Sequence, residues 1–184
     1  MAGRPALAFG AASVLVLITF TCCGLSAHAK ASGSQPAGGY VTRCGGGKIF
    51  LKASEMRTFV LHNRIRRRHH LRPFCLNPKL ERAARAHSRA MIRRDFFAHG
   101  DVGRRLHRFG YRWSRCAENI AWGQKSLGSP HNIMRSWMHS PPHRQNILDS
   151  YLHEVGVGTS SGTYKNHHHV TMYTVDFGTR SPRR

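Results

Sequence analysis

The sequence predicts an α+β fold in which helices pack on an antiparallel sheet. From residue 53 onward, apolar residues first recur at helical spacing, with proline and glycine at the ends of the segments. Residues 154–159 and 169–177 then alternate in polarity and are rich in Val, Thr and Tyr. Because the helices precede the strands without alternating with them, a parallel strand–helix–strand fold is excluded.

Two helices are expected before residue 95. Ser54 is a candidate N-cap for the first, which should end before Pro73 and turn inward a face made of Met56, Phe59, Val60 and Asn63. Asn77-Pro78 starts the second with a capping side chain and a proline at the first helical position. Its inward positions are Leu80, Ala83, Ala84, His87, Ala90 and Met91, and His87 is expected to satisfy a buried hydrogen bond.

The rest of the chain predicts two further helices and a hairpin. A short helix should run over residues 102–109, before Gly110. Another follows Ser129-Pro130, with Ile133, Met134 and Trp137 inward, and stops at residues 140–142, and residues 143–148 form one more helical turn. The two alternating segments should form a hairpin that turns at residues 160–162.

Residues 1–29 have the pattern of a secretory signal peptide. Arg4 precedes an apolar run over residues 7–20, and Ala27-His28-Ala29 is a small-x-small cleavage signal. The alternative, an uncleaved membrane anchor, is disfavoured because this run is shorter than the roughly 20 residues that span a bilayer. We therefore expect a secreted, extracellular protein with no transmembrane segment after cleavage, a flexible Gly/Ser-rich leader over residues 30–52, one domain over 53–178 and a basic tail over 179–184.

The chain is strongly basic, with 29 Lys and Arg against 8 Asp and Glu and a formal net charge of +21. Such a surface attracts polyanions, which for a secreted protein means anionic envelope polymers, lipid headgroups or extracellular nucleic acid. The alternative is a solvated basic face without a partner. No motif predicts sequence-specific nucleic acid binding. The protein is expected to be a monomer.

Three cysteines remain after residue 29, namely Cys44, Cys75 and Cys116. An oxidising compartment favours pairing, but an odd number leaves one over. Cys75 and Cys116 both lie in the expected domain and are the preferred pair, while Cys44 is left free or able to pair with a second molecule. No two cysteines have the spacing of a structural zinc site.

Three polar residues stand in apolar, turn-bounded sequence. His99 follows two phenylalanines, Glu118 precedes an apolar strand or turn over residues 119–122, and His143 opens a helical turn after Ser-Pro-Pro. A buried carboxylate needs a partner, and the histidines are the natural candidates. A histidine near a helix start should be neutral, the form that binds a metal or accepts a proton. We expect these groups to meet in one cleft.

The order of motifs resembles the bacterial CAP domain, the superfamily of cysteine-rich secretory proteins, antigen 5 and plant pathogenesis-related proteins. The resemblance covers about residues 53–178 and is carried by five motifs: Phe-x-His, Glu-Asn-Ile-Ala-x-Gly, Trp-x-x-Ser-Pro-x-His-Arg-x-Asn-Ile-Leu, Glu-Val-Gly-Val-Gly and Tyr-Thr-x-Asp-Phe-Gly. It implies a three-layer α-β-α sandwich.

Members of this superfamily gather two histidines and two acidic residues in a central cleft, which in some binds a divalent metal. By motif, His99, Glu118 and His143 match three of the four. Ser140 stands where eukaryotic members have the second glutamate, and Glu154 is a weaker candidate that either compensates or is structural. Zinc or another divalent metal on His99, Glu118 and His143 is the implied cofactor, since two imidazoles and one carboxylate suit zinc better than calcium.

Two functions remain open. The resemblance implies a secreted binding module for lipid, sterol, anionic envelope or host components. The alternative is a metal-assisted hydrolase, protease-like or directed at the cell wall, that uses the same cleft. We assign no catalytic residue, because no serine or cysteine stands in a recognisable activated setting. Binding is therefore the preferred function.

Overall fold

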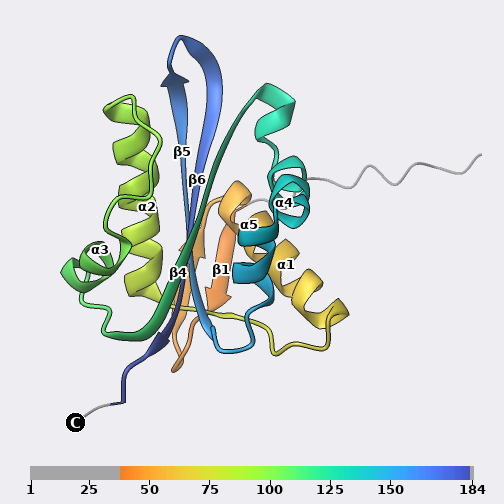
Figure 1. Cartoon of the computed structure of the whole chain (residues 1–184), viewed down its shortest axis with the longest axis vertical. Coiled ribbons are helices and arrows are strands. Elements are labelled where there is room, and N and C mark those ends of the chain that lie inside the picture. The colour runs from red at the N-terminus through yellow and green to blue at the C-terminus, as the bar shows by residue number, and fades with distance from the viewer. Residues whose placement is uncertain (1–37, 183–184) are drawn as a thin grey trace, which may run out of the picture. The chain divides into compact units, whose positions relative to one another are not determined.

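The structure is a computed structural model that describes residues 38–182. The expected signal peptide, the first part of the expected leader and the last two residues of the tail lie outside the described residues. The rest of the chain forms a central sheet with helices on both faces (Figure 1).

The central sheet has the strand order β3-β5-β6-β4. Its three long strands, β4 (Trp113–Gln124), β5 (Glu154–Tyr164) and β6 (His167–Arg180), pair antiparallel. The short β3 (Cys75–Leu76) is added in parallel beside β5. The predicted antiparallel sheet is confirmed for the long strands, and β3 makes it mixed at one edge.

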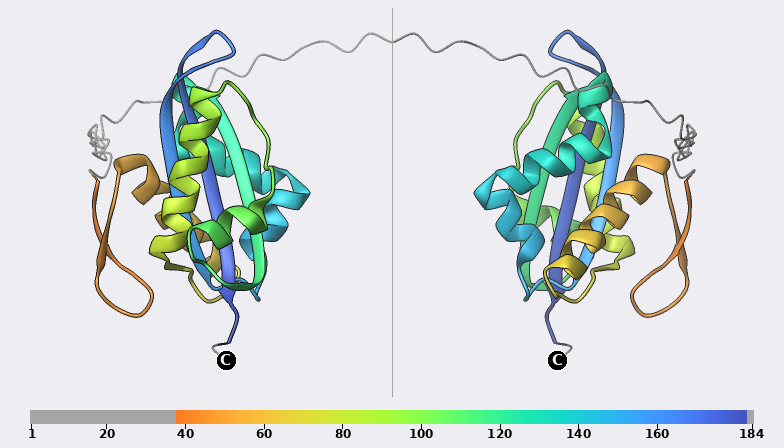
Figure 2. Two further views of the ribbon diagram at one scale, coloured as in Figure 1. Left: turned by 90° about the vertical axis from the view of Figure 1, so that its left-hand side faces the viewer. Right: turned by 90° about the vertical axis from the view of Figure 1, so that its right-hand side faces the viewer.

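Helices cover both faces of the sheet, which confirms the three-layer sandwich. One face carries α1 (Ala53–Arg68), α4 (Pro130–His139) and α5 (Pro141–Leu148), and the other carries α2 (Pro78–Arg93) and α3 (Val102–Arg108) (Figures 1 and 2). A short 3-10 helix, η1 (Lys125–Gly128), connects β4 to α4. In residues 38–182, none of these helices combines the length and the apolar character needed to cross a bilayer.

Helix α2 begins where its sequence predicts. The Asn77 side chain accepts a hydrogen bond from the amide of Lys79 at 2.9 Å, and Pro78 occupies the first helical position. Five of its six expected inward residues, all but Ala90, are buried. His87 is buried with its Nε2 3.0 Å from the carbonyl oxygen of Ala98, so its expected structural hydrogen bond is confirmed.

Two glycines of β5 let α2 lie directly on the sheet. Gly156 and Gly158 point to the same face, and a Cβ atom on either would lie 2.1 Å from the backbone nitrogen of Glu81 or Arg85. These two contact points lie four residues apart on α2, which is one helical turn. The two glycines of the Glu-Val-Gly-Val-Gly motif therefore form the surface on which the backbone of α2 packs.

The buried face of α1 differs from the predicted one. Of the predicted inward residues, Asn63 is buried, whereas Met56, Phe59 and Val60 are only partly buried. The other residues buried on α1 include Glu55, Thr58, His62 and Arg66. Glu55 and Arg66 are satisfied by tertiary partners, whereas Thr58 and His62 bond to carbonyl oxygens of α1 itself. The ring of His62 packs among Phe74, Trp137 and Phe177, and burial lowers its pKa to about 4. His62 is therefore neutral at physiological pH.

The expected leader is corrected over its described part. Residues 39–51 form an antiparallel hairpin of β1 (Gly39–Thr42) and β2 (Lys48–Leu51). A disulfide between Cys44 and Cys75 ties this hairpin to the start of β3, with a Cα–Cα distance of 5.3 Å. The segment before α1 is thus an ordered part of the fold.

The predicted Cys75–Cys116 bridge is wrong, and so is a free or intermolecular Cys44. The Cys44 amide donates to the carbonyl oxygen of Leu76 at 2.8 Å, which places Cys44 beside Cys75. Cys116 lies on β4, three strand spacings from β3, and is the free cysteine of the described residues. Three spacings amount to about 14 Å, too far for a disulfide.

The C-terminal hairpin is longer than predicted. Its turn lies at Lys165 and Asn166, which have φ of 42° and 64°, and not at residues 160–162. Such paired left-handed residues suit a tight hairpin turn. Tyr164 packs edge-on against Trp122 of β4, with ring centroids 5.2 Å apart. This contact gives the outer part of the hairpin a partner across the sheet.

Candidate functional site

Glu118 is the buried centre of the candidate site. It lies on β4, directly across from Asp176 on β6, and its side chain is 1 % exposed. Its Oε1 lies 2.7 Å from Nδ1 of His99, whose side chain is 49 % exposed. Arg105 of α3 donates to Oε2 of Glu118 and, at 2.9 Å, to the carbonyl oxygen of His99. The expectation that a histidine partners Glu118 is confirmed.

Asp176 adds a second carboxyl group beneath this pair. The residue is fully buried, and neither of its side-chain oxygens has a hydrogen-bond partner among residues 38–182. Nη2 of Arg105 lies 3.8 Å from Oδ1 of Asp176, which is too far for a hydrogen bond but near enough for electrostatic attraction. Burial, and then the charge of Glu118, raise the pKa of Asp176 well above its ordinary value. Burial therefore favours the uncharged form of Asp176, and the Arg105 charge offsets that of Glu118.

His143 reaches the same region from α5. Its Nδ1 lies 2.7 Å from the Oγ of Ser140. Burial lowers its pKa, and the nearby charge of His99 lowers it further, so the imidazole is neutral and close to His99. Asn119 on β4 donates to the carbonyl oxygen of His143 at 3.0 Å, next along the strand from Glu118. The structure thus brings the three predicted residues to one edge of the sheet.

Asn146 anchors α5 to that edge. Its side-chain amide donates to Oδ1 of Asn119 at 2.9 Å and to the carbonyl oxygen of Glu118 at 3.3 Å. Within the described part of the chain, β4 is the edge strand of the sheet, so no further strand lies beside it and its outer groups are free to accept these hydrogen bonds. Helix α5 and β4 therefore hold His143 and Glu118 in a fixed relation.

Sequence reasoning missed Arg105 and Asp176. The charge count treated all Lys and Arg residues as one basic surface, although the spacing of Arg105 places it on the apolar face of the predicted helix with Val102, Leu106 and Phe109. Asp176 stands between Val175 and Phe177 in a segment that alternates imperfectly. A charged residue on an apolar helix face and a carboxyl group inside a buried strand were the available signals.

Glu154 belongs to a different cluster. It accepts hydrogen bonds from Asn77 at 2.9 Å, from the hydroxyl of Tyr111 at 2.8 Å and from Arg180 at 2.8 Å. It lies at the start of β5, beside β3, whereas Glu118 lies on β4 at the opposite edge of the sheet. Of the two roles left open for Glu154, its contacts support the structural one.

A metal held directly by His99, Glu118 and His143 fits the residues poorly. Both oxygens of Glu118 are engaged, one by the Arg105 cation, which repels a second cation. Nδ1 of each histidine is also in use, so only the two Nε2 atoms remain, fewer than the three protein ligands of a catalytic zinc site. Within residues 38–182, only Cys44, Cys75 and Glu154 bring three potential ligand atoms within 4.8 Å of one another, and those cysteines form a disulfide.

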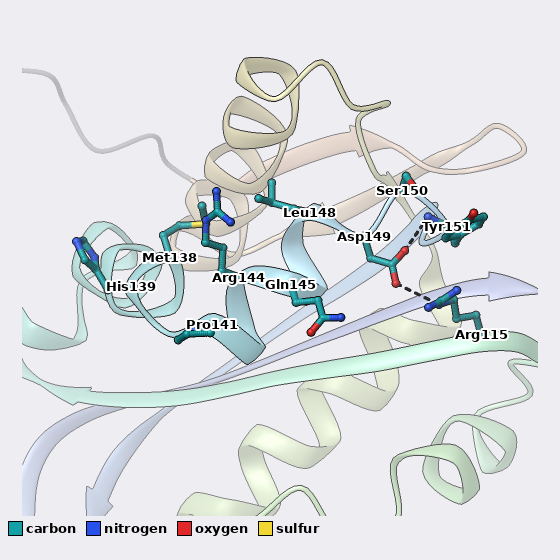
Figure 3. A pocket seen from close by; sticks show the side chains of 10 residues that line it. All are labelled: Arg115, Met138, His139, Pro141, Arg144, Gln145, Leu148, Asp149, Ser150 and Tyr151. Atoms are coloured by element: carbon teal, nitrogen blue, oxygen red, sulfur yellow. Dashed lines mark hydrogen bonds and ion pairs between the residues drawn. The ribbon is translucent and has the colours of Figure 1, made fainter.

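A pocket of about 710 Å³ opens on the outer side of α5 (Figure 3). Its lining combines α5 residues such as Arg144 and Leu148 with Asp149 and Tyr151 of the following loop. Asp149 is held by Arg115 at 3.1 Å and by the amide of Tyr151 at 2.8 Å. The lining does not include His99, Glu118 or His143, so this pocket adjoins their helix without containing the candidate site.

Comparison with known proteins agrees with the fold and the motifs. A model of the cysteine-rich secretory protein (CAP) family matches residues 59–177. The protein YkwD of Bacillus subtilis is 33% identical over 113 residues, which cover 59% of this chain and 43% of YkwD. An extracellular protein of Bacillus anthracis that contains an SCP domain is 28% identical, with a TM-score of 0.59, over 70% of this chain and 40% of that protein.

An outer surface protein of Borrelia burgdorferi shares the fold, with a TM-score of 0.62 at 15% identity, over 78% of this chain and 99% of that protein. This chain spans less than half the length of the Bacillus subtilis and Bacillus anthracis relatives. The family model covers most of the domain, including all five motif segments apart from the last glycine. The chain belongs to the cysteine-rich secretory protein, or CAP, family.

Proposed function

We propose that the chain is a secreted CAP-domain binding protein that attaches to phosphate-bearing polymers or headgroups of an envelope. His99, Glu118 and His143 form a polar recognition site in this proposal and not a catalytic centre. The pattern of residues 1–29 and the extracellular and outer-surface relatives support secretion. The charge distribution supports the anionic partner.

The observation that carries the proposal is the fate of the eight carboxylates. Five are buried, namely Glu55, Glu81, Glu118, Glu154 and Asp176. Of the other three, Asp149 pairs with Arg115, Asp101 pairs with Arg104 at 3.3 Å, and Asp95 accepts the amide of Lys165 at 2.7 Å. Within the described residues, Asp95 alone among these three has no cationic partner, so little negative charge remains to offset the surface Arg and Lys residues. A surface of one sign attracts polyanions over distances of about a Debye length.

The polar site itself supports recognition more than catalysis. Glu118 already accepts hydrogen bonds on both oxygens, which leaves no free oxygen to act as a general base. Cys116 lies two residues before Glu118 on β4, and burial raises the pKa of its thiol, which disfavours a thiolate. His99 remains half exposed beside a neutral His143, a pair suited to hydrogen-bonding a ligand.

The test measures binding of the purified protein to linear polyphosphate by calorimetry and to phosphatidylglycerol vesicles by sedimentation. We expect binding to one or both, weakening at least about tenfold between about 50 and 500 mM salt because ions screen the arginines. Neutral dextran and phosphatidylcholine vesicles are the controls. Equal affinity for the neutral controls, or binding that salt does not weaken, contradicts the proposal. The two arms separate a polymer from a lipid surface as the source of the phosphate.

A hydrolase is the second candidate, favoured by one contact. The hydroxyl of Ser140 lies 2.7 Å from Nδ1 of the neutral His143, which is the distance of a nucleophile and its base. Ser140 is also the residue before the first turn of α5, and a contact between the first and fourth residues of a helix start is a local one. The helix start explains the contact without catalysis, so binding is preferred.

The hydrolase is tested by incubation with denatured protein and with peptidoglycan fragments. Under the binding proposal, neither the natural chain nor its Ser140→Ala variant cleaves either substrate above the blank. Cleavage by the natural chain that is lost in Ser140→Ala and in His143→Gln, but kept in the exposed neighbour Arg144→Gln, would establish the hydrolase instead. Cleavage that persists in all three variants comes from another source.

A further inference from the structure

A second, larger pocket lies away from the candidate site, where four separate segments meet. Its volume is about 890 Å³. The segments are the end of β1, the start of α2, the loop between α3 and β4, and the end of β6. We call it the cationic pocket, and its lining consists of Arg43, Cys44, Gly45, Asn77, Pro78, Lys79, His107, Gly110, Tyr111, Arg112, Trp113, Arg180, Ser181 and Pro182.

The lining carries four permanent positive charges, one histidine and no carboxylate. Arg43, His107 and Arg112 are exposed and form no ion pair within the described part of the chain. Nζ of Lys79 is held by the carbonyl oxygen of Gly110 at 2.7 Å, which still leaves two of its donors free. The pocket therefore presents unpaired cations to one recessed volume that is open to solvent.

The walls of the pocket are held in place from behind. The Cys44–Cys75 disulfide fixes the wall that carries Arg43. Glu154, 7 % exposed, binds three lining residues at once through Asn77, Tyr111 and Arg180. A buried carboxylate that positions neighbouring side chains reduces the cost of ordering them when a ligand binds. Glu154 is thus a positioning residue of this pocket.

We infer that the cationic pocket binds the phosphate groups of a linear polyanion, a site separate from His99, Glu118 and His143. This inference rests on the proposed function and locates the binding site of the anionic partner. Guanidinium and ammonium groups are the side chains that bind phosphate oxygens best. A recessed volume with cations on several walls suits a chain that enters it, whereas a flat bilayer would contact only its rim. The partner is therefore a phosphodiester or polyphosphate chain.

The test compares two double variants with the same loss of charge. Arg43→Gln with Arg112→Gln removes two cations of the pocket, while Arg67→Gln with Arg68→Gln removes two exposed cations from α1 on the other face of the sheet. Affinity for linear polyphosphate is measured by calorimetry at about 0.15 M salt. We expect the pocket variant to bind at least about tenfold more weakly, and the α1 variant to lose less than about threefold.

The outcomes separate this inference from the proposed function. Equal weakening in both variants means that phosphate binds diffusely, which overturns the pocket while polyanion binding stands. Weakening for phosphatidylglycerol vesicles alone, with polyphosphate binding unchanged, also overturns it, because the partner is then a lipid surface. If the natural chain binds no polyphosphate and no vesicle, both proposals fall. Unchanged circular dichroism of both variants confirms that affinity, and not folding, is compared.

Discussion

Replacing Gly156 with alanine is expected to destabilise the fold by more than about 4 kcal/mol, because the added methyl group would overlap the backbone of α2. The new Cβ would lie 2.1 Å from the backbone carbon of Leu80 and the nitrogen of Glu81. Backbone atoms cannot rotate away as a side chain can, so all of α2 must shift from the sheet. Urea unfolding followed by circular dichroism measures the loss.

Gly162 supplies a matched control on the same strand and the same face. A Cβ there would meet the Cγ2 of Ile92 at 2.7 Å, the far end of a side chain that can change its rotamer. Gly162→Ala should therefore cost at most about 1–2 kcal/mol. A Gly156→Ala variant as stable as Gly162→Ala would show that α2 does not rest on the backbone of β5.

Replacing Arg66 with leucine is expected to cost about 3–5 kcal/mol, the second largest effect. The Arg66 guanidinium is fully buried and lies 3.8 Å from the ring centroid of Phe74. It donates to four backbone carbonyl oxygens, at 2.7–3.2 Å, those of Arg72, Ile147, Asp149 and Leu152. Leucine would remove the donor for these acceptors, which lie in the loop after α1, at the end of α5 and in the loop after it, and each lost hydrogen bond is costly where it is buried.

The charge of Arg66 persists in the folded protein. Burial lowers its pKa to about 10, and the nearby Asp149 acts in the opposite direction, so the group is still protonated at neutral pH. Arg67→Leu is the control, because Arg67 is its exposed neighbour on α1 and should change the free energy of unfolding by less than about 0.5 kcal/mol. Similar thermal denaturation curves for the two variants would rule out the anchoring role of Arg66.

Arg66 also shows a limit of the sequence-based prediction. It stands within Arg64-Ile65-Arg66-Arg67-Arg68, a run in which a basic surface is the expected role of every arginine. Nothing in that run distinguishes the one arginine that α5 and its following loop bury. Three of the four carbonyl groups that accept its hydrogen bonds are 81 to 86 positions further along the chain, and the fourth is that of Arg72. Burial of a charge depends on such distant partners and cannot be predicted from its neighbours.

The sequence predicted the central residues of the candidate site, but it missed the residues that contact them. Glu118 was expected to pair with a histidine because a carboxylate in an apolar strand needs a partner, and His99 lies at 2.7 Å. Arg105 and Asp176 complete the arrangement, but both depend on α3 and β6 crossing beside β4. The poor fit of a direct metal ligand set follows from Arg105, which the sequence did not identify as a site residue.

The sequence by itself determined the fold class, the starts of α2 and α4, the family and the residues at the centre of the site. These features are local, because a capping side chain, a proline and a period of 3.6 or 2 act within a few residues of one another. The tertiary structure alone decided the Cys44–Cys75 pairing, the hairpin before α1, the buried arginines and the role of Glu154. Each of these depends on groups far apart in the chain, whose proximity is created only when the sheet and its helices pack.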